Sequence, residues 1–172
     1  MKIFLTGRPG SGKTTVVKNF IEKFPGKVCG FLTPEIRESG KRTGFLLKLI
    51  PSGEELVFAS TQKISSVKFG KYYLNLENLD KAIEKISANL RECEVVAIDE
   101  IGKMEMFSPK FKEFIRELLK KDINLLAVVH RAYAKEFEKY GEVIWVRESN
   151  REEVLNRLLS VYKSHAVQKN RC

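Results

Sequence analysis

The chain has 172 residues, 43% of them hydrophobic and 31% charged, which suits one soluble domain over residues 1–172 with a full core. No apolar run approaches the roughly eighteen residues of a membrane span. The formal net charge of +9 raises the question of RNA or DNA, but the basic excess is spread along the chain without a stripe interleaved with aromatics. Nucleic acid is therefore not the favoured partner, and we expect a monomer.

Cysteine usage and the start of the chain bear on the compartment. Cys29, Cys93 and Cys172 are an odd set without paired spacing, as expected of a reducing cytosol. Cys29 and Cys93 lie in or beside apolar runs, so we expect packing residues, and two histidines argue against a zinc site. A strand at the amino terminus leaves no place for a signal peptide. These features predict a cytoplasmic protein, and abundant Lys and Glu with little Gln are typical of thermophiles.

The first segment carries the strongest motif. Residues 3–5 predict a buried strand, and Gly7-x-x-x-x-Gly12-Lys13-Thr14 then fits the phosphate-loop pattern ahead of a predicted helix over 13–23. Backbone N–H groups and the helix amino terminus would cradle a polyphosphate. Lys13 would reach the β- and γ-phosphates, and the Thr14 hydroxyl would ligate Mg²⁺. The predicted nucleotide-binding residues here are Gly7, Arg8, Pro9, Gly10, Ser11, Gly12, Lys13, Thr14 and Thr15.

The next part of the chain predicts an antiparallel meander. Strands are expected over residues 28–33, 43–50 and 55–59, with 34–38 extended and turns at 39–42 and 51–53. Residues 61–73 are polar and contain glycine, which predicts a loop or a short extended stretch. This meander interrupts an alternation of strands and helices.

The rest of the chain restores that alternation. A helix beginning at Asn78 or Leu79 precedes a buried strand over 94–98, and Ser108 with Pro109 begins the next helix. A strand over 123–129, a helix around 133–139, a strand over 143–146 and a final helix capped by Ser149 or Asn150 follow, with residues 168–172 frayed. The pattern predicts a three-layer α/β fold, mainly parallel, with helices on both faces and the meander inserted after the first helix.

Two adjacent carboxylates follow the central strand. In parallel sheets the ligand lies at the carboxyl ends of the strands, where Asp99 and Glu100 occur. Asp99 would hold Mg²⁺ beside Thr14, and Glu100 would accept the proton of a water that attacks the γ-phosphate. A solvated loop is the alternative for this pair.

Arginines and a histidine give weaker candidates. His130 and Arg131 follow a predicted strand and could sense the γ-phosphate, although a solvated loop is equally compatible. Phosphoryl transfer benefits from an arginine that neutralises developing charge. The sequence does not choose among the candidates Arg8, Arg37, Arg42, Arg131 and Arg151.

In these motifs the chain resembles the THEP-type nucleoside triphosphatases, a family of RecA-like phosphate-loop proteins. The phosphate loop is shared by many families, whereas Gly-Phe-Leu-Thr-Pro-Glu-Ile-Arg at 30–37 and Asp-Glu-Ile-Gly-Lys-Met-Glu at 99–105 are more specific. Gly44-Phe45 and Asn150-Arg151 also match the family. The resemblance implies hydrolysis of ATP, GTP, CTP, UTP and other nucleoside triphosphates with Mg²⁺ and broad base tolerance.

Carried over to this sequence, the resemblance makes Lys13 and Glu100 catalytic and extends nucleotide binding to the second motif. That motif comprises Val95, Val96, Ala97, Ile98, Asp99, Glu100, Ile101 and Gly102. Arg37, Lys103, Glu105, Asn150 and Arg151 match family positions without a defined role. The sequence contains no guanine-reading Asn-Lys-x-Asp element, which is consistent with broad base tolerance.

Two other functions stay open. The phosphate loop also resembles that of adenylate kinases, which would make the chain a small nucleoside or nucleotide kinase, but strands and turns occupy the place after the first helix where an arginine-rich lid would be expected. The net charge keeps an ATP-dependent nucleic-acid binder open, although no base-stacking platform is evident.

Overall fold

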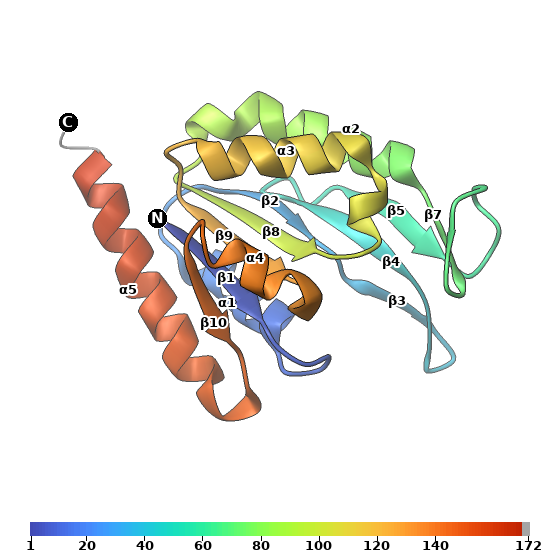
Figure 1. Cartoon of the computed structure of the whole chain (residues 1–172), viewed down its shortest axis with the longest axis horizontal. Helices are drawn as coiled ribbons and strands as arrows, with labels where there is room; N and C mark the ends of the chain where they lie inside the picture. The colour runs from blue at the N-terminus through green and yellow to red at the C-terminus, as the bar shows by residue number, and fades with distance from the viewer. Residues whose placement is uncertain (170–172) are drawn as a thin grey trace.

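The computed structural model describes residues 1–169, and side chains as far as Ala166. Within them, one mixed sheet has the strand order β10-β1-β9-β8-β2-β4-β5-β7-β6, and β3 pairs with β4 (Figure 1). The sheet divides into a parallel part, which contains the strand before the phosphate loop, and an antiparallel part formed by the meander.

The parallel part contains the buried strands. It consists of β10 (Glu142–Trp145), β1 (Lys2–Thr6), β9 (Leu125–Val129), β8 (Val95–Ile101) and β2 (Val28–Leu32). All residues of β9 and β2 are buried, as expected where helices cover both faces of a parallel sheet. The carboxyl ends of these strands therefore meet at one edge.

The antiparallel part begins where β2 pairs with β4. It consists of β4 (Lys41–Ile50), β5 (Glu55–Ser60), β7 (Tyr72–Leu74), the two-residue β6 (Lys68–Phe69) and β3 (Glu35–Glu38). The segment 61–73, predicted as a loop or short extended stretch, thus contributes two short strands. The hairpin of β3 and β4 extends past the body of the sheet (Figure 1).

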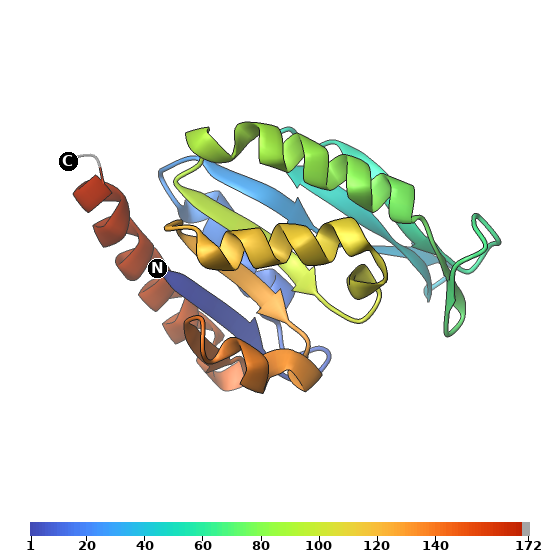
Figure 2. The same ribbon diagram turned by 45° about the horizontal axis from the view of Figure 1, so that its top comes forward.

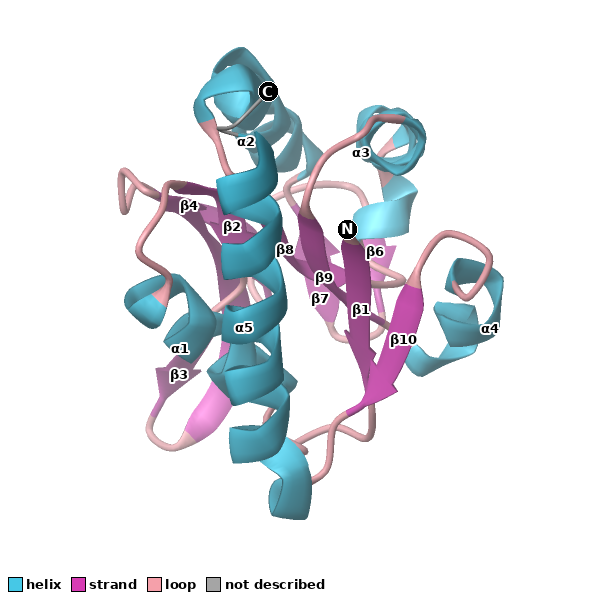
Figure 3. Ribbon diagram, turned by 90° about the vertical axis from the view of Figure 1, so that its left-hand side faces the viewer, coloured by secondary structure: helices cyan, strands magenta, loops and turns pink. Residues whose placement is uncertain are grey.

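Helices cover both faces of the sheet (Figures 2 and 3). On one face lie α2 (Leu76–Asn89), α3 (Pro109–Lys120) and the short α4 (Ala134–Phe137). On the other face α1 (Lys13–Lys23) packs against α5 (Arg151–Lys169). Single turns of 3₁₀-helix, η1 (Leu90–Glu92), η2 (Glu105–Phe107), η3 (Arg131–Tyr133) and η4 (Glu148–Asn150), join these elements.

Each core cluster takes alternate residues of the same strands. Along β1, Phe4 faces the cluster under α2, α3 and α4, whereas Ile3 and Leu5 face the cluster under α1 and α5. This is the period of two expected of a strand. The predicted fold class is confirmed, and none of the described helices is long and apolar enough to cross a membrane.

Helix boundaries differ from the prediction at two places. Helix α2 begins at Leu76 rather than at residue 78 or 79, because the Asn75 side chain accepts a hydrogen bond of 2.9 Å from the Asn78 amide and caps the helix earlier. Helix α5 includes residues 168 and 169, which were expected to fray, and residues 170–172 lie outside the described part of the chain.

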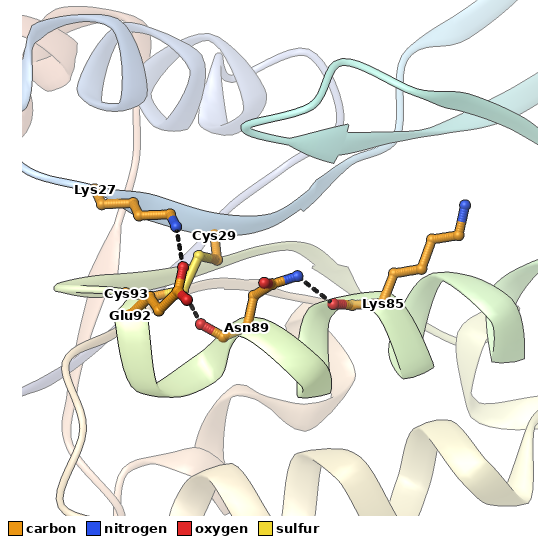
Figure 4. The surroundings of a disulfide bond; sticks show 6 residues. All are labelled: Lys27, Cys29, Lys85, Asn89, Glu92 and Cys93. Atoms are coloured by element: carbon orange, nitrogen blue, oxygen red, sulfur yellow. Dashed lines mark hydrogen bonds and ion pairs between the residues drawn. A yellow bond between two sulfur atoms is a disulfide. The ribbon is translucent and has the colours of Figure 1, made fainter.

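The prediction that Cys29 and Cys93 are unpaired packing residues is wrong, because they form a disulfide (Figure 4). Their Cα atoms lie 5.8 Å apart although 64 residues separate them in sequence. Parallel pairing of β2 with β8 aligns Cys29 with Val96 and so brings the two cysteines together. The argument from cysteine spacing for a reducing compartment therefore does not hold.

Candidate active site

The phosphate loop connects β1 to α1 at the carboxyl edge of the sheet. Gly12 caps α1 in the left-handed region, with φ at 98°, which favours glycine. Gly7, with φ at 147°, lies so close to the neighbouring strand that a Cβ there would be 2.7 Å from the Val146 carbonyl oxygen. These positions place the loop backbone and the amino terminus of α1 at one edge of a cavity, as an anion site requires.

Lys13 lies folded along this loop. Its Nζ donates hydrogen bonds to the carbonyl oxygens of Gly7 at 2.7 Å and Arg8 at 3.0 Å. Burial lowers the pKa of Lys13, while the carboxylates of Glu100 and Asp99 oppose that shift. The ammonium group is thus within electrostatic reach of both carboxylates predicted to share its site.

Asp99 ends the buried run of β8 and is 1% exposed. Burial, followed by the neighbouring Glu100, raises its pKa to about 7, whereas a hydrogen bond with the Thr14 side chain opposes the shift. The Thr33 hydroxyl donates to the Asp99 carbonyl oxygen at 2.8 Å and fixes the backbone. Within the described residues Asp99 Oδ2 has no hydrogen-bond partner, so a buried acceptor stands beside the Thr14 hydroxyl.

The carboxyl groups of Glu100 and Glu105 both face Gly102. Glu105 is 3% exposed, and burial together with Glu100 raises its pKa to about 8. Burial also raises the pKa of Glu100, against the influence of Lys13. A Cβ on Gly102 would lie 2.6 Å from Glu100 Oε1 and 2.7 Å from Glu105 Oε2. Because glycine has no side chain, both carboxyl groups fit at this position.

The oxygen atoms around Asp99 fit a magnesium ion. Thr14 and Asp99 supply a hydroxyl and a buried carboxylate oxygen without a partner, and both are hard ligands. The described residues contain no group of three or more His, Cys, Asp or Glu side chains that could hold a metal alone. An ion here would therefore complete its coordination with phosphate oxygens and water, as Mg²⁺ usually does.

Arg151, at the start of α5, lies across the outer side of the phosphate loop. Its Nε donates to the Ser11 carbonyl oxygen at 2.7 Å, and a terminal nitrogen donates to Gly10 at 3.3 Å. A Cβ on Gly12 would lie 2.1 Å from the same Nε, so the guanidinium occupies the space that glycine leaves open. Asn150 instead bonds within its own loop, accepting from the Arg147 amide and donating to the Trp145 carbonyl.

One cavity of about 520 Å³ joins these groups. Arginines reach it from three directions: Arg42 from β4, Arg131 from the turn after β9, and Arg151 from α5. Glu100, Glu105 and His130 also line it, and burial is the main cause that lowers the pKa of His130. The full set is Gly7, Pro9, Gly10, Gly12, Lys13, Thr14, Thr15, Thr33, Pro34, Glu35, Arg42, Phe45, Phe58, Asp99, Glu100, Met104, Glu105, His130, Arg131 and Arg151.

Some predicted residues do not line this cavity. Five of them are apolar residues of β8 that belong to the two core clusters. The predicted residues outside the cavity lining are Arg8, Ser11, Arg37, Val95, Val96, Ala97, Ile98, Ile101, Gly102, Lys103 and Asn150.

The cavity also has lining residues that the sequence reasoning did not single out as ligands. Thr33, Pro34 and Glu35 follow β2, the neighbour of β8, and belong to the Gly-Phe-Leu-Thr-Pro-Glu segment, which was the available signal. Met104 lies within the 99–105 motif and Phe45 within the Gly44-Phe45 pair, which are parts of the same resemblance, whereas Phe58 gives no such signal because an isolated apolar residue in a predicted strand suggests packing.

A sheet with a parallel core covered on both faces, a glycine-rich loop followed by a lysine, and an aspartate near a strand end define the class of P-loop NTPase folds. The model of the family described as NTPase matches residues 2–159. The chain is 40% identical to the nucleoside-triphosphatase THEP1 of Methanocaldococcus jannaschii, over 95% of this chain and all of that protein. The chain belongs to the THEP1-type nucleoside-triphosphatase family.

Other relatives and solved structures agree. A THEP1 nucleoside-triphosphatase of a Thermotoga species is 35% identical over 98% of this chain and 99% of its own length. The crystal structure of THEP1 from the hyperthermophile Aquifex aeolicus superposes with a TM-score of 0.84 at 32% identity, covering 94% of this chain and 99% of that one. The solution structure of a human cancer-related nucleoside triphosphatase gives 0.69 at 28% identity, covering 95% and 97%.

Proposed function

We propose that this protein is a Mg²⁺-dependent nucleoside triphosphatase that converts ATP, GTP, CTP and UTP to the diphosphate and phosphate. The observation that carries the proposal is the position of Glu100, a half-buried carboxylate that lines the same cavity as Lys13 and the phosphate loop. A carboxylate there can accept a proton from water, which hydrolysis requires and simple nucleotide binding does not.

The reaction follows from the groups around the cavity. Loop amides and Lys13 hold the β- and γ-phosphates, and a water beside Glu100 attacks the γ-phosphorus while the bond to the bridging oxygen breaks. The proton of the water passes to Glu100, and the diphosphate leaves with the bridging oxygen. Arg131, which lines the cavity and whose charge acts on Lys13, is placed to neutralise charge that develops on the γ-phosphate.

Magnesium would be held by the Thr14 hydroxyl and Asp99, where it supplies charge neutralisation at the phosphate oxygens. We also propose that base identity is read weakly, because the sequence has no Asn-Lys-x-Asp element that would select guanine. A monomer suffices for this chemistry, because Lys13, Asp99, Glu100, Arg131 and Arg151 all come from one chain.

The test is phosphate release from the four triphosphates with Mg²⁺, compared with the same reactions in excess chelator. We expect turnover of all four within about tenfold of one another and none in chelator, since the contacts lie on the phosphates. Turnover of a single base would contradict broad tolerance, and undiminished turnover in chelator would contradict the metal assignment. Light scattering measures the mass of the active protein and so tests whether it is a monomer.

A further inference from the structure

The cavity continues past the groups that hydrolysis uses. In the strand order β1-β9-β8-β2-β4-β5, the phosphate loop follows β1, and Asp99 and Glu100 lie on β8 (Figure 1). A polyphosphate held by Lys13 therefore points its terminal phosphate from β1 toward β8. The part of the cavity over β2, β4 and β5 lies beyond that phosphate, on the side away from β10.

We call this part the outer end of the cavity; its lining residues are Pro34, Glu35, Arg42, Phe45, Phe58, Met104 and Glu105. Four of these side chains are apolar, which a polyphosphate does not need. The ring of Phe45 packs edge to face on Tyr72 with centroids 5.4 Å apart, and this contact fixes its orientation. The outer end thus offers a fixed aromatic surface next to the reacting phosphate.

Two polar groups complete the outer end. Arg42 is held by Glu35 at 3.0 Å, and its guanidinium lies 5.5 Å from the centroid of the Phe45 ring. Glu105 is 3% exposed, yet its Oε2 has no hydrogen-bond partner among the described residues. Leaving a buried oxygen unpaired is costly, so this atom calls for a hydroxyl or N–H group from a bound molecule.

We propose that the outer end binds a nucleoside monophosphate, which takes the γ-phosphoryl group from the triphosphate on the phosphate loop. Its planar base would lie against Phe45 and Met104, and its phosphate would pair with Arg42. A ribose hydroxyl or a base N–H would donate to Glu105 Oε2. The proposal rests on the proposed function only in placing the triphosphate on the phosphate loop.

The transfer is balanced without a further reactant. An oxygen of the monophosphate forms a bond to the γ-phosphorus as the bond from that phosphorus to the bridging oxygen breaks, giving two nucleoside diphosphates. The attacking oxygen is already anionic, so no proton has to leave it. Glu100, which hydrolysis needs as a base, is therefore dispensable for the transfer.

Binding is measured by calorimetry with AMP, GMP, CMP and UMP, after Mg²⁺ and a non-hydrolysable ATP analogue have filled the phosphate loop. We expect at least one monophosphate to bind, and Arg42→Gln to weaken it about tenfold or more because a charged hydrogen bond is lost. Arg37→Gln is the matched control: Arg37 lies on the same hairpin and pairs with the same Glu35 at 2.9 Å, but does not line the cavity. It should change the affinity less than about twofold.

Transfer is measured with ATP labelled on the γ-phosphate, by following label into the second diphosphate in wild type and in Glu100→Gln. Label in that diphosphate, retained in Glu100→Gln while phosphate release falls, supports the proposal. No monophosphate bound at about 10 mM, equal affinity in Arg42→Gln, or label only in phosphate would overturn it. Release of phosphate from ATP without any monophosphate reports on the hydrolase proposal separately.

Discussion

At the scale of single residues, the candidate site depends on the close approach of the half-buried Glu100 and the buried Glu105 across Gly102. Both carboxyl groups lie at the ends of flexible side chains. One oxygen of each would lie within 2.7 Å of a Cβ at position 102. Such ends can turn away at small cost, so an added methyl group would displace the carboxyl groups rather than unfold the chain.

Gly102→Ala should therefore separate catalysis from stability. We expect kcat to fall about tenfold or more because Glu100 leaves its place, with KM nearly unchanged and the free energy of unfolding lowered by about 1 kcal/mol or less. Steady-state kinetics and denaturant unfolding measure the two effects. An unchanged kcat would show that the position of Glu100 does not matter.

The buried Glu105 predicts a pH dependence of stability. Its pKa rises from an ordinary 4.5 to about 8, so between these values the unfolded chain ionises while the native group keeps its proton. The unfolded state then binds fewer protons, and stability falls as pH rises through this window, by about 1.4 kcal/mol per unit for this group.

Glu105→Gln should remove this contribution of Glu105 to the pH dependence of the free energy of unfolding, measured in chelator-treated protein. The variant is expected to gain stability over wild type at pH 8 and to gain nothing near pH 4.5, as measured by denaturant unfolding. Glu138→Gln, at an exposed position, serves as the control. Parallel pH profiles of wild type and Glu105→Gln would show that Glu105 ionises normally in the fold.

At the scale of elements, the Cys29–Cys93 disulfide joins the start of β2 to the turn after α2, with an ion pair of 2.6 Å between Lys27 and Glu92 beside it. The two cysteines enclose the whole meander. Loop entropy for a separation of 64 residues gives a stabilisation of about 4 kcal/mol at most.

Cys93→Ser should lower the free energy of unfolding by up to about 4 kcal/mol while sparing turnover, because the disulfide does not line the active-site cavity. Wild type in reductant should unfold like the variant, and the variant should be insensitive to reductant. Equal stability of oxidised and reduced wild type would contradict a stabilising bond.

The sequence could predict those elements whose signals are local. The β-branched run of β8, the phosphate loop and the Ser108 cap, which accepts from the Phe111 amide at 3.0 Å, each depend on neighbouring residues. The disulfide and the pairing of 61–73 into β6 and β7 depend on partners distant in sequence. The early start of α2 depends on the cap at Asn75, which the helical spacing of apolar residues from Leu79 onward does not indicate.

At the scale of the whole molecule, the site is assembled from segments that the sheet brings together. Local motifs were enough to predict Lys13, Thr14, Asp99 and Glu100. They could not predict that Arg151 bonds to Ser11 across 140 residues, or that Thr33 holds the backbone of Asp99 across 66. Those contacts follow from strand order and from the packing of α5 on α1.

The meander contributes directly to the cavity. The sequence indicates only that strands and turns occupy the place where a kinase would have its lid. In the structure Arg42, Phe45 and Phe58 of the meander line the cavity. Extending the sheet past β2 therefore enlarges the site beyond the terminal phosphate.

In the proposed mechanism Glu100 activates water while Lys13 binds phosphate. The decisive experiment measures nucleotide affinity and phosphate release side by side in wild type, Glu100→Gln and Lys13→Ala. Glu100→Gln should keep its affinity and lose roughly 100-fold or more in turnover, since only proton acceptance is removed. Lys13→Ala should lose both together. Turnover of Glu100→Gln at the wild-type rate would contradict water activation by Glu100.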